Sequence, residues 1–376
     1  MTEAVFSTDL AGIQVGETRI SNVDGENGKL SYRGVAIEEL IDRPFLQVVW
    51  LLLTGSDPGL QQETQLQAYM ALHSNLNKRE LSMVSQLPST LHPMLMLQSL
   101  VPVLNLDSDD RIDGISEDAH RGLLIASKIP GLIAAKHQIE CGHDPIKANV
   151  HMSFHENFLT MFNGRAPTAA QVRVLDITQI LQLEHSYNAS TFAGRVCAST
   201  LAPIQSSLAA SIATLSGTLH GGADQAALEM AQAVGSADEA AAYVANCLQS
   251  KQKIMGIGHR EYKVVDPRAT ILKPIARSLC NEGEARQLFD TLLAIETACQ
   301  SEFSMSGKQI QANVEFYKGA VFYSLGIPPH YFTGLFTMAR VFGYVAHFLE
   351  FSTHRKLIRP LAKYVGDQMT VQEGES

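Results

Sequence analysis

Apolar residues recur at helical spacing along most of this chain, whereas the alternating pattern of a half-buried strand is scarce. Residues 284–300 place one apolar stripe on a single helical face, made of Leu288, Phe289, Leu292, Ile295 and Cys299. Residues 333–351 show a second stripe, made of Phe336, Ala339, Phe342, Gly343, Ala346 and Phe351. The chain is therefore expected to be mainly α, with many helices in a bundle-like packing.

Capping and turn residues predict where some of these elements begin and end. Thr168 after Pro167, with Gln171 three residues on, predicts a helix from Thr168 to about His185. Ser236 with Glu239 repeats this capping pattern and predicts a further helix, with one apolar face made of Ala240, Val244, Cys247 and Leu248. Two turn dipeptides, Asp-Gly and Asn-Gly, predict a short hairpin near residues 18–33.

The composition limits the classes of partner. The 376 residues are 45% hydrophobic and 18% charged, as in a globular protein with one large core or two domains. The net charge of −9 argues against a general affinity for nucleic acid or anionic membranes, although a polyanionic small ligand needs only a local basic cluster. The longest apolar run, residues 48–53, is far below the roughly 20 residues that cross a bilayer.

The cysteines and the first residues bear on the compartment. The 5 cysteines are odd in number and lie outside any Cys-x-x-Cys pattern, which favours free thiols in a reducing cytoplasm. Residues 1–6 lack a basic stretch followed by an apolar one, so no signal peptide is expected. Cys141, His143 and Asp144 are metal-ligand types, but the rest of a ligand set is missing. We therefore expect a cytoplasmic protein without a metal site.

Three segments carry residue types that perform acid–base chemistry. His220 lies in a glycine-rich stretch at 215–223, His259 lies in a second one at 255–268, and Glu315 follows in the segment 312–319. Two histidines and a carboxylate can together deprotonate a carbon acid and protonate a carbonyl. Each alone is ambiguous, since an isolated Leu-His-Gly-Gly is more often a hydrogen-bonded turn histidine. Glu315 alone is equally well explained as a partly exposed acid at a helix start.

Basic residues accompany these segments. The guanidinium of Arg268 matches a carboxylate with two hydrogen bonds, and the ammonium of Lys263 suits a phosphate. A solvated charge run is the alternative, but the Gly-Ile-Gly turn at 256–258 and Pro267 make a plain helix face a poorer explanation. Arg340 lies in a helix too apolar to hold a charge without a partner.

The order and the amino-acid sequences of the three segments resemble those of the citrate synthase family. Ser21-Asn22-Val23-Asp24-Gly25, the stretch 30–34 and His92-Pro93-Met94 match the family as well, so the resemblance covers roughly residues 15–365. It implies a multi-helix fold with a large domain, 1–221 plus 331–376, and a small domain, 222–330, that closes over the active site. It also implies a homodimer or an assembly of dimers.

The family's residue roles then fall on particular positions of this chain. The resemblance implies that Glu315 is the base, that His220 stabilises the enol of acetyl-CoA and that His259 protonates the carbonyl of oxaloacetate. It implies an oxaloacetate pocket made of His185, Asn188, Arg268, Arg340 and Arg359, the last of which reaches in from the other subunit. Coenzyme A would lie against Met255, Gly256, Ile257, Gly258 and Lys263. The implied enzyme is an acyltransferase of the tricarboxylic acid cycle that uses acetyl-CoA and oxaloacetate and needs no cofactor.

Two positions depart from the family's usual pattern. The base is more often Asp, so Glu315 carries one extra methylene, and Gln182 stands where a second histidine is common. A carboxylate misplaced by about 1 Å can cost on the order of a hundredfold in rate. Two alternatives stay open. A 2-methylcitrate synthase that uses propionyl-CoA shares the same motifs, and Glu315 is the one feature that favours a weakened paralogue acting as a binding or assembly protein.

Overall fold

A small antiparallel sheet lies at the start of the described chain. The computed structural model describes residues 7–258, 261–305, 310–353 and 356–366. The strands β1 (Ser21–Asp24), β2 (Lys29–Tyr32) and β3 (Val35–Ala36) form the sheet in the order β1-β2-β3. Ser21 pairs with Tyr32 and Asp24 with Lys29, which confirms the predicted hairpin.

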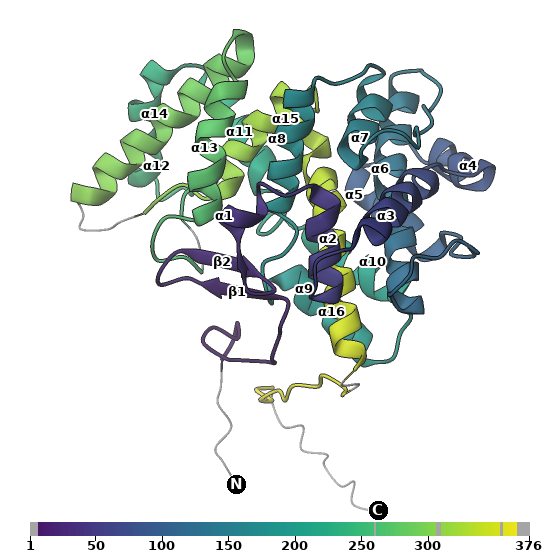
Figure 1. Ribbon diagram of the computed structural model, residues 1–376. Helices are drawn as coiled ribbons and strands as arrows, with labels where there is room; N and C mark the ends of the chain where they lie inside the picture. The colour runs from purple at the N-terminus through teal and green to yellow at the C-terminus, as the bar shows by residue number, and fades with distance from the viewer. Residues whose placement is uncertain (1–6, 259–260, 306–309, 354–355, 367–376) are drawn as a thin grey trace, which may run out of the picture.

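Helices make up most of the remaining described chain, which confirms the mainly α expectation (Figure 1). The first half contains α1 (Ile37–Leu40), α2 (Phe45–Thr54), α3 (Leu60–His73), α4 (Lys78–Gln86), α5 (Pro93–Leu100), η1 (Val101–Val103), α6 (Glu117–Glu140), α7 (Phe154–Asn163), α8 (Ala169–Ile180), α9 (Ala189–Ser199) and α10 (Ile204–Leu215). The second half contains α11 (Ala223–Val234), η2 (Ala237–Glu239), α12 (Ala240–Gln249), α13 (Pro267–Leu279), α14 (Gly283–Met305), α15 (Val314–Ser324), η3 (Pro329–Tyr331) and α16 (Phe332–Ser352).

Helix α16 is the centre of the core. It is buried along almost its whole length and packs against α2, α6, α9 and α10 (Figure 1). The apolar stripe expected for 333–351 is buried in this helix, and the stripe expected for 284–300 is buried in α14. The named stripe residues are buried in both helices, as predicted, but α16 is buried on every face from Phe332 to His347, as expected for a helix that is apolar all round.

The end of α8 differs from the prediction. Thr168 caps this helix and forms a capping box with Gln171, as expected, but the helix stops at Ile180 and not near His185. The hydroxyl of Tyr32 on β2 donates to the carbonyl oxygens of both Ile180 (3.0 Å) and Glu184 (3.2 Å). Donors from other elements thus satisfy carbonyl groups that a longer helix would pair internally, and residues 181–188 are left as an irregular segment.

The prediction of a capping box at Ser236 is also wrong. Its side chain makes no capping hydrogen bond, and a single 3₁₀ turn, η2, separates it from α12. The predicted apolar face is nevertheless correct, because Ala240, Val244 and Cys247 are buried and Leu248 packs against the core. The helix thus begins four residues after Ser236, at Ala240.

Helices α11 to α14 gather on one side of the molecule (Figure 1), and α15 packs against α11, α13 and α14. The proposed domain limits at 222 and 330 bracket this group. No helix within the described ranges is both long and apolar enough to span a membrane.

Candidate active site

Backbone pairing joins the second glycine-rich segment to the start of α15. Gly258 donates its N–H to the carbonyl of Gln311 (2.8 Å), and Asn313 donates to the carbonyl of Gly256 (3.0 Å). Gly256 and Gly258 have φ values of +75° and +83°, in the left-handed region that favours glycine. The pairing therefore places the turn at 255–258 directly beside Glu315, which lies in the first turn of α15.

His220 lies in the tight turn between α10 and α11. The N–H of Gly221 donates to the carbonyl of Leu215 (3.0 Å), and a Cβ on Gly221 would overlap that same oxygen. Glycine is thus required here by close approach of the backbone. Nε2 of His220 lies 2.7 Å from Oγ of Ser190, and Tyr344 on α16 donates to the same Oγ (2.7 Å).

The electrostatic surroundings keep the His220 ring neutral. Burial is the largest cause, followed by the positive charge of Arg340, and Lys318 adds to it; together they lower the pKa of His220 to about 4. The negative charge of Glu315 acts in the opposite direction. The centre of the Phe336 ring on α16 lies 6.4 Å from that of His220, 4.1 Å from Nζ of Lys318 and 4.7 Å from Cζ of Arg340, so these side chains converge on one site. A neutral imidazole can donate one hydrogen and accept another.

The lowered pKa of His220 makes both the charge of its ring and its contribution to stability depend on pH. The ordinary pKa is 6.5, so the unfolded chain binds a proton at His220 more readily than the folded one. We expect the stability contributed at His220 to be lost as pH falls from about 6.5 towards 4, and the ring to stay neutral from pH 5 to 8. NMR titration of the ring Cε1–Hε1 signal, assigned with His220→Asn, measures this. A midpoint near 6.5 would contradict the assignment of a buried, cation-flanked ring.

Arg268 and Asp266 form a buried pair at the start of α13. Nε and Nη2 of Arg268 donate to the two carboxylate oxygens of Asp266, at 3.0 and 2.8 Å. Asp266 also accepts the N–H of Val314 (3.2 Å), the residue before Glu315. Burial acts to lower the pKa of Arg268, but Asp266 and then Glu315 raise it above its ordinary value. The guanidinium therefore stays charged, and Asp266 ties it to the helix that carries Glu315.

Arg340 lies on α16 and is almost completely buried. Only 1% of it is exposed, its Nε donates to the carbonyl of Gln182 (2.6 Å), and its Cζ lies 4.7 Å from the centre of the Phe336 ring. The apolar helix thus holds its charge against a backbone oxygen and an aromatic face. His185, which follows Gln182 along the chain, is buried with Nε2 at 3.1 Å from the hydroxyl of Tyr262.

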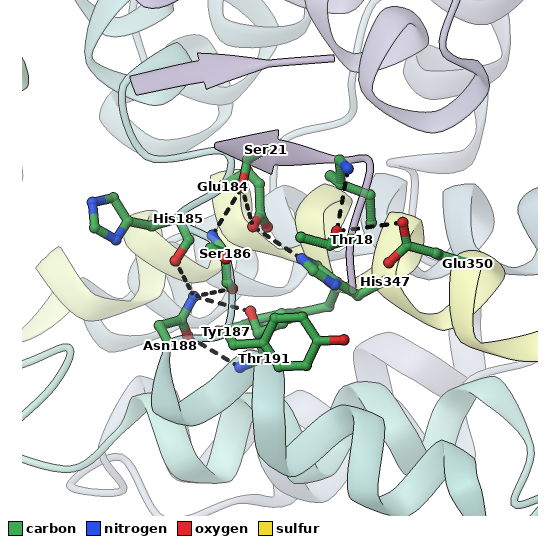
Figure 2. A network of polar contacts seen from close by, with 12 residues as sticks. Thr18, Ser21, Glu184, His185, Ser186, Tyr187, Asn188, Thr191, His347 and Glu350 are labelled. Atoms are coloured by element: carbon green, nitrogen blue, oxygen red, sulfur yellow. Dashed lines mark hydrogen bonds and ion pairs between the residues drawn. The ribbon is translucent and has the colours of Figure 1, made fainter. Parts of the chain in front are cut away.

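A buried polar network supports the segment that carries His185 and Asn188 (Figure 2). Ser21 on β1 accepts the N–H of Ser186 (3.0 Å) and donates to Glu184 (3.1 Å). Nε2 of His347 on α16 lies 2.9 Å from the same Glu184 oxygen. Ser186 has φ +52°, a left-handed conformation that costs a non-glycine residue about 1–3 kcal/mol. The hydrogen bond that Ser186 donates to Ser21 compensates part of this cost and fixes the turn beside the site.

The far side of His347 links this network to α9. Arg195 lies with Nη1 at 2.8 Å from Nδ1 of His347 and 2.9 Å from Glu350. Arginine is only a donor, so Nδ1 accepts and Nε2 of His347 donates to Glu184. Asn188 caps α9, since its Oδ1 accepts the N–H of Thr191 (3.0 Å).

The predicted coenzyme A segment rests on the N-terminal hairpin. The N–H of Lys263 donates to the carbonyl of Gly25 (2.9 Å), and a Cβ on Gly25 would overlap the Glu261 carbonyl. The Lys263 ammonium is largely exposed and pairs with Glu26. Met255 and Ile257 are half-buried and pack against the core. Lys263 thus exposes a cation while its own backbone is held by the N-terminal hairpin.

One predicted residue is not brought into this cluster, and another is not among the residues that the structure describes. Arg359 is exposed on the segment after α16, where Ile358 donates its N–H to Ser199 (3.1 Å). His259 lies outside the described residues, although Gly258 and Glu261 on either side of it are placed.

Several contacts in the site were not expected from the sequence. Ser190 and Tyr262 contact the predicted histidines and Tyr344 donates to Ser190. Asp266 holds Arg268, and Lys318 acts on His220. Asp266 had a local signal, because an acid before proline marks a helix start. The other residues lie on elements distant from the groups that they contact or influence, and no sequence pattern pointed to them. Among the described residues no group of three or more His, Cys, Asp or Glu is placed to hold a metal.

Comparison with known proteins agrees over nearly the whole length. A family profile described as "Citrate synthase, C-terminal domain" matches residues 9–361. A citrate synthase from Synechocystis is 37% identical, with 96% of this chain and 91% of the relative covered, and a 2-methylcitrate synthase from Shewanella oneidensis is 32% identical, with 95% and 94% covered. A solved citrate synthase from Thermoplasma acidophilum, in ternary complex with carboxymethyl coenzyme A and oxaloacetate, superposes with a TM-score of 0.88 at 27% identity and covers 98% of both chains.

Proposed function

This chain belongs to the citrate synthase family, and we propose that it condenses acetyl-CoA with oxaloacetate and hydrolyses the citryl-CoA intermediate to citrate and CoA. The observation that carries the proposal is the convergence of His220, Glu315, Arg268 and Arg340 on one site. The site offers a carboxylate, a neutral imidazole and two buried guanidinium groups. A carbon acid and a dicarboxylate are the partners that this set of groups fits.

In the first step the Glu315 carboxylate takes a proton from the methyl carbon of acetyl-CoA. The electron pair moves into the thioester, and His220 donates a hydrogen bond to the enolate oxygen that develops. The ring is neutral, so it carries a single hydrogen. When Ser190 donates to Nε2, that hydrogen is on Nδ1, where a ligand oxygen can accept it. Ser190 Oγ then no longer donates to Oδ1 of Asn188, 2.7 Å away, which still accepts the N–H of Thr191.

In the second step the enolate carbon attacks the keto carbon of oxaloacetate, and His259 protonates the new alkoxide. Arg268 and Arg340 bind the carboxylates of oxaloacetate, with His185 beside them, and Arg359 of a second subunit completes the pocket in a homodimer. Water then cleaves the thioester. The steps are proton transfers, formation of one carbon–carbon bond and hydrolysis of a thioester. None of them is a redox step, so the reaction needs no metal or redox cofactor.

Coenzyme A is proposed to lie along 255–258, with Lys263 near a phosphate. The exposed ammonium of Lys263 and the left-handed glycines beside Glu315 support this placement. Closure of the 222–330 domain would exclude water until the condensation is complete. All 5 cysteines are free thiols, which supports our proposal of a reducing compartment such as the cytoplasm.

Use of propionyl-CoA is the second candidate, since the relative from Shewanella oneidensis is a 2-methylcitrate synthase. The two substrates differ by one methylene, which is worth about 1–3 kcal/mol in an apolar pocket, or roughly 10–200-fold in kcat/KM. The longer side chain of Glu315 takes up space near the acyl carbon and favours the smaller substrate.

The test is release of CoA thiol with oxaloacetate and either acyl-CoA. We expect kcat/KM for acetyl-CoA to exceed that for propionyl-CoA by at least about tenfold. The reverse order would identify a 2-methylcitrate synthase. Background release with both substrates, together with normal oxaloacetate binding by calorimetry, would instead identify a binding or assembly protein.

A further inference from the structure

A buried ion pair behind the site has no place in the reaction described above. Lys318 and Asp224 are both 0% exposed, and Nζ of Lys318 lies 3.1 Å from Oδ2 of Asp224. Nζ also lies 3.4 Å from Oε1 of Gln182 and 4.1 Å from the centre of the Phe336 ring. Lysine is almost never fully buried in proteins unless it is paired.

Such a pair is poor evidence for stability. The desolvation of two charges offsets most of their attraction, and apolar residues of similar volume often stabilise a fold as well or better. Burial also raises the pKa of Asp224, and the positive charge of Lys318 opposes that rise. Stability alone therefore does not explain why a buried ion pair stands at this place in the fold.

That position connects the elements that carry the catalytic groups. Lys318 lies on α15, three residues after Glu315, and Asp224 lies four residues after His220, at the start of α11. A Cβ on Gly319 would come within 2.8 Å of the Asp224 carbonyl oxygen, so the two helices touch at this point. Gln182 links the pair to Arg340, which donates to its carbonyl group.

We propose that Lys318 is a positioning residue for the condensation: its ion pair with Asp224 holds the helix of Glu315 in register with the turn of His220. The inference rests on the proposed function. The charges that face His220 are Arg340 on α16, and Glu315 and Lys318 on α15, while Ser190 on α9 contacts its ring. Lys318 is the one of these three charges that has no proposed contact with substrate.

The test replaces both charges at once, since Lys318→Met alone would leave Asp224 buried and unpaired. The double variant Lys318→Met/Asp224→Asn keeps the volume and removes the pair. We expect it to fold with a melting temperature close to that of the wild type, and kcat to fall at least about tenfold because small misplacements of a base are costly. KM for oxaloacetate should stay within about twofold. The NMR midpoint of His220 should move to higher pH, because the cation that lowers its pKa is gone.

A matched control is available elsewhere in the fold. Lys128 on α6 and Glu80 on α4 form a second buried pair, at 2.9 Å, whose members are 7% and 1% exposed. Lys128→Met/Glu80→Gln should leave kcat and the His220 midpoint unchanged. If Lys318→Met/Asp224→Asn folds with wild-type kcat and midpoint, the inference is wrong while the proposed function stands. If the wild type itself releases no thiol, the proposed function fails and the inference fails with it.

Discussion

Replacing Glu315 by Gln is expected to lower kcat about a thousandfold, within the 10²–10⁴ range that general base catalysis contributes. The amide has almost the same shape as the carboxylate but cannot accept the methyl proton. Glu315 is half-buried in the first turn of α15, and its charge acts on both His220 and Arg268. Oxaloacetate binding does not use this carboxylate, so KM for oxaloacetate should stay within about twofold.

The loss can be assigned to the base because the variant leaves His220 in the same state. Glu315 raises the pKa of His220, so removal of its charge lowers that pKa further and keeps the ring neutral. Steady-state thiol release measures the effect. Glu229→Gln, on the exposed face of α11, is the matched control and should be silent. A Gln variant within tenfold of the wild type would rule Glu315 out as the base.

Glu315→Asp tests how closely the reach of the side chain is tuned. Aspartate is one methylene shorter, and a displacement of about 1 Å can cost on the order of a hundredfold. We expect kcat of this variant to lie between those of the wild type and Glu315→Gln. Activity at or above the wild-type level would mean that the backbone already suits the shorter residue.

Replacing Arg268 by Met is expected to lower kcat/KM for oxaloacetate by about a hundredfold to a thousandfold, since removal of one member of a buried charged contact costs about 2–5 kcal/mol. The same change leaves Asp266 buried without its partner, at a cost of about 3–5 kcal/mol in stability. The melting temperature should therefore fall as well. Because Asp266 accepts the N–H of Val314, the start of α15 should also be loosened.

Arg268→Lys separates substrate recognition from folding. The ammonium keeps the charge beside Asp266 but cannot form the paired hydrogen bonds of a guanidinium, so stability should recover more than kcat/KM. Arg277→Met, on the exposed side of the same helix, is the control. Thiol release at varied oxaloacetate and thermal unfolding give the two readouts. If Arg268→Lys binds oxaloacetate as the wild type does, the arginine serves the fold alone.

Local features were predictable because their causes lie within a few residues of one another. The apolar stripes of α14 and α16 and the capping box at Thr168 follow from helical spacing, and the hairpin follows from two turn dipeptides. The early end of α8 was not predictable from the sequence, because its cause lies in distant elements. Helix α8 stops early because Tyr32 and Arg340 take the carbonyl groups of Ile180, Gln182 and Glu184.

The sequence by itself determined the helical class, the family and the candidate residues His220, Glu315, Arg268 and Arg340, because spacing and residue type are properties of the chain alone. The tertiary structure decided which groups surround them. Ser190, Asp266 and Lys318 reach the site from separate helices, and the burial that keeps His220 neutral exists only when α9, α15 and α16 pack around it. Charge interactions in a low-dielectric interior depend on distances between elements, and no sequence pattern specifies those distances.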